Sequence, residues 1–112
     1  MDRDILSAED DGIFEQALAL LETVHGGSRS SYREIRELDP AVERRDTLVA
    51  FVDGMVVGHL QVLPREMRGG RSVLRVAGLA LLAVNPAERG NGHGRALIQA
   101  APRRIARDGY HL

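Results

Sequence analysis

The chain has 112 residues, of which 44% are hydrophobic and 28% charged, so its length fits a single globular domain with its own core. Its 15 basic and 16 acidic residues leave a formal net charge of -1, which gives no electrostatic basis for binding nucleic acid. Cysteine is absent, which excludes disulfides, thiolate metal ligands and cysteine nucleophiles. Without a signal sequence or a long apolar run, we expect a cytoplasmic protein that makes no contact with a membrane.

The first segment predicts a short strand followed by a helix. Residues 4–7 match a short strand, and Ser7 with Asp10 has the spacing of an N-cap box, with Asp in place of the usual Glu. Apolar residues then recur at three- and four-residue intervals, which is the period of an amphipathic helix. We therefore expect a helix over about residues 9–24 that ends at Gly26.

A second, shorter helix is expected next. Ser31 and Glu34 form a capping box, and Ile35 and Leu38 supply an apolar side. Pro40 cannot continue a helix because it has no backbone N–H, so the helix ends before it.

Two antiparallel strands joined by a tight turn are expected between residues 47 and 63. Asp53-Gly54 lies between two apolar runs, and this dipeptide is the strongest short-range signal of a hairpin. The polar segment 64–71 then predicts a loop. Residues 72–84 are apolar at nearly every position, which predicts a central strand buried on both faces beneath helices.

The last predicted helix covers about residues 93–107 and is closed by Gly109. Its apolar side consists of Leu97, Ala101 and Ile105. Pro102 lies inside it and predicts a bend or break, because proline removes one backbone hydrogen bond. Residues 110–112 look like the start of another strand. This order predicts an α/β fold, with a mixed, largely antiparallel sheet flanked by helices, in one domain over residues 1–112.

The segment from Arg89 to Gly94, RGNGHG, joins the apolar strand to this helix and has the features of an anion site. Glycines admit positive φ angles and let a ligand approach the backbone. The first N–H groups of a helix lack partners and lie at the positive end of its dipole, so phosphates bind there. Arg89 and Arg95 flank the turn and can add charge-assisted hydrogen bonds. The alternative is a strand-to-helix turn that binds nothing.

Two common phosphate-binding motifs fit this turn poorly. A P-loop needs a lysine followed by serine or threonine after its second glycine, and the turn has neither. A dinucleotide-binding fingerprint has a different glycine spacing and an acidic ribose contact, and too little chain follows here for another strand–helix–strand unit.

The same six residues resemble the acetyl-CoA signature of the GNAT superfamily of N-acetyltransferases, R/Q-x-x-G-x-G/A, found between the fourth strand and the third helix of that fold. RGNGHG fits every position of the signature. The preceding LAVNPAERG, the following GRALIQAA and the hairpin VDGMVVGHLQVL are also similar to the family. The resemblance covers essentially the whole chain.

The resemblance implies a site for acetyl-CoA and direct transfer of its acetyl group to a primary amine. Backbone amides of the turn would hold the pyrophosphate. Amides at the end of the apolar strand would pair with the pantetheine arm and polarise the thioester carbonyl, which stabilises the oxyanion formed as the amine attacks. The implied cofactor-binding residues are Leu82, Ala83, Val84, Arg89, Gly90, Asn91, Gly92, His93, Gly94 and Arg95.

The sequence departs from the family in the groups that would exchange protons. The apolar strand has no carboxylate, where many relatives carry a basic Glu, so no catalytic base or acid is assigned. Glu66 and Glu88 are the nearest acids, and both are expected to be solvated surface residues. His59 and Gln61 alternate along one strand and could order a water, although a packed or exposed His59 is the stronger expectation. No two histidines have the spacing of metal ligands.

The chain also stops where relatives continue with a fifth strand, a fourth helix and a final hairpin. We therefore expect a GNAT domain truncated after its third helix, with an unpaired apolar strand edge that favours a homodimer or another partner completing the sheet. The function expected is an acetyl-CoA-dependent N-acetyltransferase acting on a small molecule or protein. The alternative is a catalytically inactive scaffold that acts as a CoA-binding or sheet-completing module.

Overall fold

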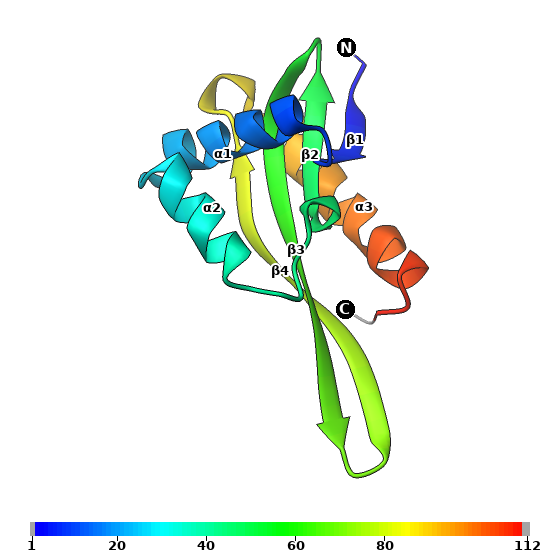
Figure 1. The fold of residues 1–112 in the computed structure, drawn as a ribbon. Helices are drawn as coiled ribbons and strands as arrows, with labels where there is room; N and C mark the ends of the chain where they lie inside the picture. Colours follow the sequence, from blue (N-terminus) through cyan, green and yellow to red (C-terminus); the bar gives the residue numbers. More distant parts are fainter. Residues whose placement is uncertain (1, 111–112) are drawn as a thin grey trace.

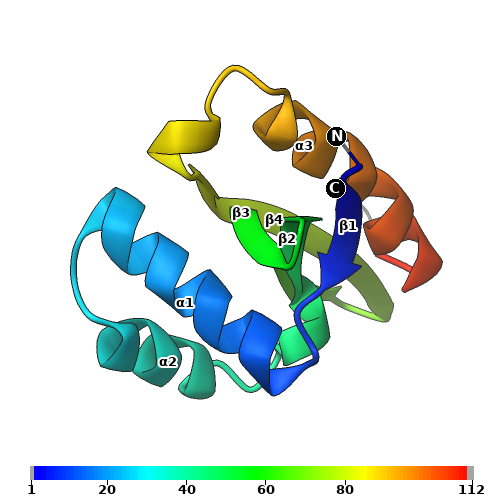
Figure 2. The same cartoon turned by 90° about the horizontal axis from the view of Figure 1, so that it is seen from above.

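A computed structural model describes residues 2–110 as a sheet with helices on both faces. Its elements are β1 (Asp4–Ser7), α1 (Asp11–His25), α2 (Arg29–Glu37), the 3-10 turn η1 (Arg44–Asp46), β2 (Thr47–Val52), β3 (Met55–Gly69), β4 (Ser72–Val84), the 3-10 turn η2 (Pro86–Glu88) and α3 (His93–Arg107). The strand order is β1-β2-β3-β4, and every neighbouring pair is antiparallel. Helices α1 and α2 cover one face and α3 covers the other (Figure 1 and Figure 2), which confirms the predicted α/β architecture.

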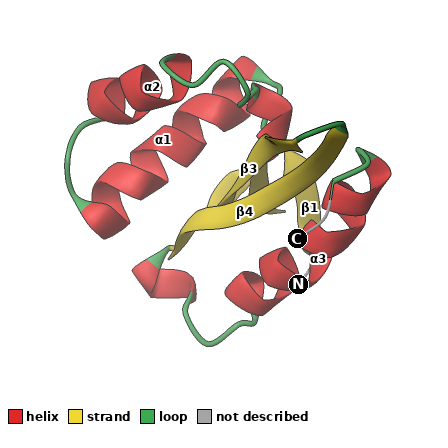
Figure 3. Ribbon diagram, turned by 90° about the horizontal axis from the view of Figure 1, so that it is seen from below, coloured by secondary structure: helices red, strands yellow, loops and turns green. Residues whose placement is uncertain are grey.

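Helices lie on both faces of the sheet (Figure 3). A hydrophobic cluster fills the space between the sheet and the helices on each side. Leu18 and Leu21 of α1 are completely buried on one side. On the other side the predicted apolar stripe of α3 is buried, namely Leu97, Ala101 and Ile105. Burying one leucine contributes roughly 2 kcal/mol of transfer free energy. The two clusters therefore fix α1 and α3 against opposite faces of the same strands.

Both N-terminal helices are capped by residues other than those predicted. The carboxylate of Asp10 caps α1 by accepting a hydrogen bond from the N–H of Ile13 at 3.0 Å. Ser7 does not cap it, because Ser7 is the last residue of β1 and is paired with β2. Ser28 caps α2 by accepting from the N–H of Ser31 at 3.1 Å, so the cap predicted at Ser31 is also wrong. The predicted helices themselves are confirmed.

β3 and β4 form a long arm where the polar sequence predicts a loop. Asp53 and Gly54 make the predicted tight turn between β2 and β3, with φ of 49° and 79°. The loop predicted at 64–71 is wrong, because β3 continues through most of this segment into the arm at the bottom of Figure 1. Cross-strand pairs hold the arm, among them Glu66 opposite Arg75. The segment is polar because this arm projects beyond the helices into solvent.

β4 is an edge strand within the described residues, so the prediction of a central strand buried on both faces is wrong. Only Ala77 and Ala83 of β4 are buried, whereas Val73 and Leu74 are about half exposed. One half of β4 lies in the projecting arm, and the other half has β3 on one side only. The apolar run thus marks a strand whose faces and edge are only partly covered within residues 2–110.

Helix α3 spans the predicted residues and continues through Pro102 without a break. The expected break is absent because Leu97 and Ile105, on either side of the proline, are both buried against the sheet. Gly109 follows the helix with φ of 79°. Tyr110 packs on the cluster under α3. The strand start predicted at 110–112 lies largely outside the described residues.

Candidate functional site

The turn between β4 and α3 is shaped by an asparagine cap and two glycines. The side-chain oxygen of Asn85 accepts a hydrogen bond from the N–H of Ala87 at 3.0 Å and starts η2. Gly90 and Gly92 have φ of 87° and 80°, a region that side chains rarely adopt. Gly92 is the N-cap of α3. The two glycines therefore carry the chain from the strand into the first turn of the helix.

The backbone N–H groups of residues 90–95 form a row of free donors. None of them donates to an acceptor within the part of the chain that the structure describes. The first bonded donor is Ala96, whose N–H reaches the carbonyl of Gly92 at 3.0 Å. Helix α3, which is 15 residues long, begins at this turn, so the positive end of its dipole lies here. Such a row of donors at a helix start suits phosphate oxygens.

A third arginine lies at this turn, beside the two that the sequence indicated. Arg3 donates from Nη1 to the carbonyl of Gly92 at 2.7 Å and from Nη2 to that of Asn91 at 3.4 Å. Arg89 and Arg95 are exposed and flank the same turn in the sequence. Sequence reasoning missed Arg3 because no local pattern connects residues 89 positions apart. Only the packing of α3 across β1 brings it here.

Glu88 is a partly exposed turn residue, as predicted, and its carboxylate also organises the turn. It accepts hydrogen bonds from Asn91 Nδ2 at 2.8 Å and from His93 Nε2 at 3.3 Å. The bond from Asn91 and then that from His93 hold the pKa of Glu88 below its ordinary value. The His93 side chain is only 1% exposed. Because it points inward, only its backbone N–H is available at the turn.

β4 contains a bulge shortly before this turn. Where β3 contributes one residue, Leu60, β4 contributes two, Leu81 and Leu82. Leu81 has φ of 53°, a left-handed conformation that costs a residue with a side chain roughly 1–2 kcal/mol. Backbone strain of this kind marks a candidate functional position.

The bulge separates two apolar clefts on opposite faces of the sheet. The α3-side cleft, of about 310 Å³, is lined by Leu60, Leu79, Ala80, Leu81, Leu82 and Ile98. The α2-side cleft, of about 190 Å³, is lined by Leu21, Tyr32, Ile35, Arg36, Asp39, Val42, Gln61, Leu63 and Leu81. Leu81 lines both clefts, so two ligands that approach from opposite faces would meet at the strained residue.

The three strand residues predicted to bind the cofactor arm lie between the bulge and the turn. Leu82 lies in the bulge and lines the α3-side cleft. Ala83 is buried with the α1 cluster, and Val84 is paired with Gly58 of β3. The structure thus brings the strand end, the glycine turn and Arg3 to one end of the sheet.

Neither of the acids weighed as possible bases, Glu66 and Glu88, lines either cleft. Glu66 lies on the projecting arm, where it forms ion pairs with Arg68 at 3.6 Å and Arg75 at 3.9 Å, as expected for a surface residue. No described carboxylate lines the α3-side cleft. Asp39 of the α2-side cleft is paired with Arg65 at 2.5 Å. Among residues 2–110, no three or more His, Asp or Glu side chains come together to hold a metal.

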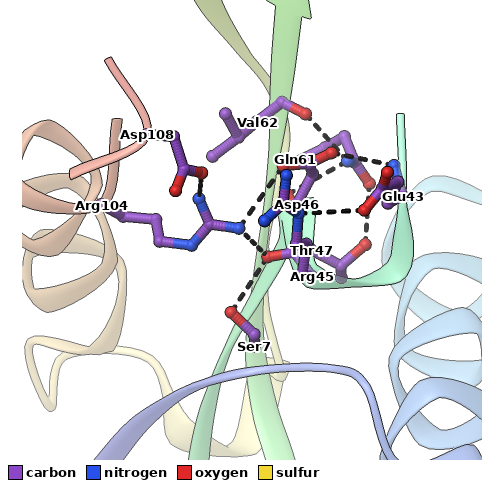
Figure 4. A network of polar contacts seen from close by, with 9 residues as sticks. All are labelled: Ser7, Glu43, Arg45, Asp46, Thr47, Gln61, Val62, Arg104 and Asp108. Carbon is purple, nitrogen blue, oxygen red and sulfur yellow. Dashed lines mark hydrogen bonds and ion pairs between the residues drawn. The ribbon is translucent and has the colours of Figure 1, made fainter. Parts of the chain in front are cut away.

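Gln61 belongs to a buried polar network between β2, β3 and α3 (Figure 4). Its oxygen accepts a hydrogen bond from Thr47 Oγ1 at 3.0 Å, and its Nε2 donates to the carbonyls of Asp46 at 3.1 Å and Val62 at 3.0 Å. Arg104 of α3 reaches the Asp46 carboxylate at 3.4 Å. Because both amide hydrogens of Gln61 are used, it has no donor left to order a water, contrary to expectation.

We expect Gln61→Leu to lower the free energy of unfolding by about 1–3 kcal/mol, because the buried Thr47 hydroxyl and Asp46 carbonyl lose their partner. Affinity for acetyl-CoA should remain within about twofold, since the network lies away from the turn. Urea denaturation measures the first effect. Gln99→Leu, at an exposed position of α3, is the matched control and should change stability by no more than about 0.5 kcal/mol. Equal losses in the two variants would contradict the assignment.

His59 is completely buried, as the stronger sequence expectation had it. Its Nδ1 donates to the carbonyl of Leu81 at 2.8 Å, which fixes the Nδ1–H tautomer because a carbonyl only accepts. Its Nε2 is buried without a partner among the described residues. Burial lowers the pKa of His59 to about 4, although the bond to Leu81 opposes the shift. His59 is therefore neutral at physiological pH.

Comparison with sequence models of protein families identifies the family of this chain. Residues 6–112 match the sequence model of the acetyltransferase (GNAT) domain. The chain belongs to the GNAT family. This confirms the family that RGNGHG and its flanking segments resemble. No curated protein matches the chain significantly.

Solved structures share the GNAT fold of this chain. A GCN5-related N-acetyltransferase from Anabaena variabilis superimposes with a TM-score of 0.76 at 22% identity, over 96% of this chain and 27% of that one. The apo aminoglycoside 6'-N-acetyltransferase from Acinetobacter haemolyticus gives 0.69 at 21%, over 98% and 74%. Saccharomyces cerevisiae N-myristoyltransferase with bound myristoyl-CoA gives 0.73 at 13%, over 97% and 29%.

These identities establish the fold alone. The chain spans less than a third of the length of the Anabaena variabilis protein, and the same holds for the N-myristoyltransferase. As to membrane insertion, no helix within residues 2–110 has both the length and the apolar character needed to cross a bilayer.

Proposed function

We propose that this GNAT chain binds acetyl-CoA and transfers the acetyl group to a primary amine. The observation that carries the proposal is the row of unbonded N–H groups at 90–95 beside Arg3, Arg89 and Arg95. A pyrophosphate supplies the negative charge and the acceptor oxygens that this turn lacks. Membership in the GNAT family supports the acetyl-transfer chemistry, and the neighbour with bound myristoyl-CoA supports a thioester as the donor.

The free space at the turn fits a ligand laid against the backbone. A Cβ built on Gly90 meets no atom within 4 Å, and one built on Gly92 meets only the Arg3 guanidinium, at 3.8 Å. The residues proposed to hold the cofactor are those of the turn, 89–95, and the strand end, 82–84. Acetyl-CoA supplies an activated acetyl carbon in its thioester.

The chain would promote the reaction by position and polarisation. Backbone N–H groups at the bulge would donate to the thioester oxygen, and the oxyanion that develops there strengthens those bonds. The amine would enter through the α2-side cleft and meet the thioester at Leu81. As the neutral amine attacks, the C–N bond forms and the C–S bond breaks, which releases CoA as its thiolate. The proton of the new ammonium leaves to solvent, because Asp39, the carboxylate that lines the α2-side cleft, is paired with Arg65. Such a reaction would proceed in the cytoplasm.

A second candidate function is a scaffold that binds CoA without turnover. It is favoured by the lack of a carboxylate at the α3-side cleft and by the outer edge of β4, which has no partner strand within residues 2–110. In either case we propose that residues 1–112 act as one GNAT-type domain. A second copy of the chain or another partner would pair with the β4 edge and complete the sheet.

We expect Arg3→Glu to raise the Kd for acetyl-CoA at least about tenfold, because it replaces a charge-assisted donor at the turn by a repelling carboxylate. Arg71→Glu, in the turn between β3 and β4, makes the same change of charge far from the site and should leave the Kd within about twofold. Isothermal titration calorimetry measures both values. Equal effects of the two variants would contradict the assigned site.

Thiol release in the presence of a panel of primary amines separates the two candidate functions. Amine-dependent release of CoA supports the transferase. Binding of acetyl-CoA with no release above the buffer rate for any amine supports the scaffold.

A further inference from the structure

Two histidines bind the consecutive carbonyl oxygens of the β4 bulge. His59 Nδ1 donates to the oxygen of Leu81 at 2.8 Å, and His25 Nε2 donates to the oxygen of Leu82 at 3.2 Å. The donors come from different elements, β3 and the last residue of α1. Because a bulge disrupts the regular ladder at its extra residue, carbonyls there need partners from elsewhere. The carbonyl of each bulged residue therefore accepts a hydrogen bond from an imidazole.

Both imidazoles approach the bulge from the α1 side of the sheet. His59 lies directly between Val49 and Ala83 across the strands, and both of these neighbours pack in the cluster under α1. Directly opposed residues of neighbouring strands share a face. His25 ends α1 itself. The carbonyls of Leu81 and Leu82 therefore point toward α1.

The direction of a carbonyl fixes the direction of the next N–H. A trans peptide unit is planar and its N–H points opposite to its C=O, and no cis peptide occurs among the described residues. The unit that contains the Leu81 carbonyl also contains the N–H of Leu82, which consequently points away from His59. By the same rule the N–H of Ala83 points away from His25, toward β3, where Ala83 is paired with His59. The α3-side cleft lies on the face opposite to α1.

We propose that His59 and His25 are positioning residues that hold the β4 bulge so that the Leu82 amide faces the acyl group in the α3-side cleft. This assignment rests on the proposed acetyl transfer, since it names what orients the donors that polarise the thioester. His59 carries the larger share, because it is completely buried and its bond is shorter, whereas His25 is exposed. Neither imidazole need touch the substrate or exchange a proton with it.

The energetics favour an arrangement that is held in place. The left-handed conformation of Leu81 is strained, and each hydrogen bond from an imidazole stabilises the bulge. Without these bonds no local interaction would hold Leu81 in its strained conformation, and the peptide planes of the bulge would be free to rotate. The hydrogen bonds of the two histidines together offset the strain.

The first experiment compares His59→Leu with His59→Asn, whose side-chain NH₂ lies close to the place of Nδ1–H. In His59→Leu we expect kcat to fall about 10- to 100-fold, as for a misplaced oxyanion donor. The KM for acetyl-CoA should stay within about threefold, because the glycine turn is unchanged. His59→Asn should recover most of kcat. Equal loss of kcat in the two variants, or no loss in His59→Leu, would overturn the proposal.

The same pair at the other carbonyl is His25→Leu and His25→Gln, where the Gln NH₂ replaces Nε2–H. A smaller fall in kcat is expected for Leu, with recovery in Gln. These exposed substitutions also decide the matter if His59→Leu does not fold. An unchanged kcat in His25→Leu would remove His25 from the proposal.

Nuclear magnetic resonance tests the arrangement independently of turnover. In the wild-type chain the ring nitrogens of His59 should show a proton on Nδ1 and none on Nε2 at neutral pH. Acetyl-CoA should shift the Leu82 amide resonance more than CoA does, whereas both ligands should shift residues 90–95 equally. A proton on Nε2, or identical shifts at Leu82 with both ligands, would overturn the positioning role. If no amine is acetylated the proposed transfer fails, and these two spectra still decide whether the Leu82 amide faces the acyl group.

Discussion

Gly92→Glu should weaken acetyl-CoA binding by at least about 100-fold. Its side chain would lie beside Arg3, whose guanidinium is 3.8 Å from a Cβ at this position. The carboxylate would take the place proposed for a phosphate and repel the remaining phosphate charge. Calorimetric titration of the variant measures the loss directly.

The control for this variant must reproduce its backbone strain. Gly54 has φ of 79° against 80° for Gly92, and a Cβ at Gly54 meets no atom within 4 Å. Gly54→Glu thus introduces the same charge in the same conformation, at the turn between β2 and β3. We expect its unfolding free energy to fall about as much as that of Gly92→Glu, roughly 1–2 kcal/mol, while acetyl-CoA still binds. Wild-type affinity in Gly92→Glu would contradict the site.

Acid should destabilise the protein through His59. The unfolded chain takes up a proton on this imidazole as the pH falls through 6.5, whereas the buried native imidazole stays neutral until its pKa of about 4. Because the unfolded state binds more protons in this window, the free energy of unfolding falls with falling pH. Over the whole window the loss from this one group is about 3 kcal/mol.

Comparison with His59→Leu isolates that contribution. All other titrating groups are common to the two proteins, so the stability advantage of the wild type should shrink by about 3 kcal/mol between pH 7 and pH 4. Urea denaturation at four or five pH values gives the difference. Parallel pH profiles of the two proteins would show that His59 has an ordinary pKa.

Local sequence patterns were sufficient to predict the elements that are determined by residues close together in the sequence. The repeat of Leu97, Ala101 and Ile105 fixed both the extent and the buried side of α3, and Asp53-Gly54 located the hairpin. The family could be recognised because RGNGHG is a contiguous motif whose glycines and arginines act through the adjacent backbone.

Patterns failed where distant packing decides. The segment 64–71 reads as a loop because polar residues are common to loops and to strands solvated on both faces. The apolar run of β4 indicates that both faces of the strand can be buried. Within residues 2–110 they are only partly buried. Arg3 reaches the turn only through tertiary structure, and the bulge at Leu81 depends on hydrogen bonds from two other elements. None of these contacts leaves a local trace in the sequence.

The most direct test of the account is the map of amide chemical-shift changes when acetyl-CoA is added to the isotopically labelled chain. We predict saturable shifts concentrated at residues 90–95, with a second group at Leu82 and Ala83. The absence of saturable shifts at millimolar acetyl-CoA would contradict it. So would shifts centred on the groove between β1 and α3, lined by Arg103 and Arg107, with residues 90–95 unchanged.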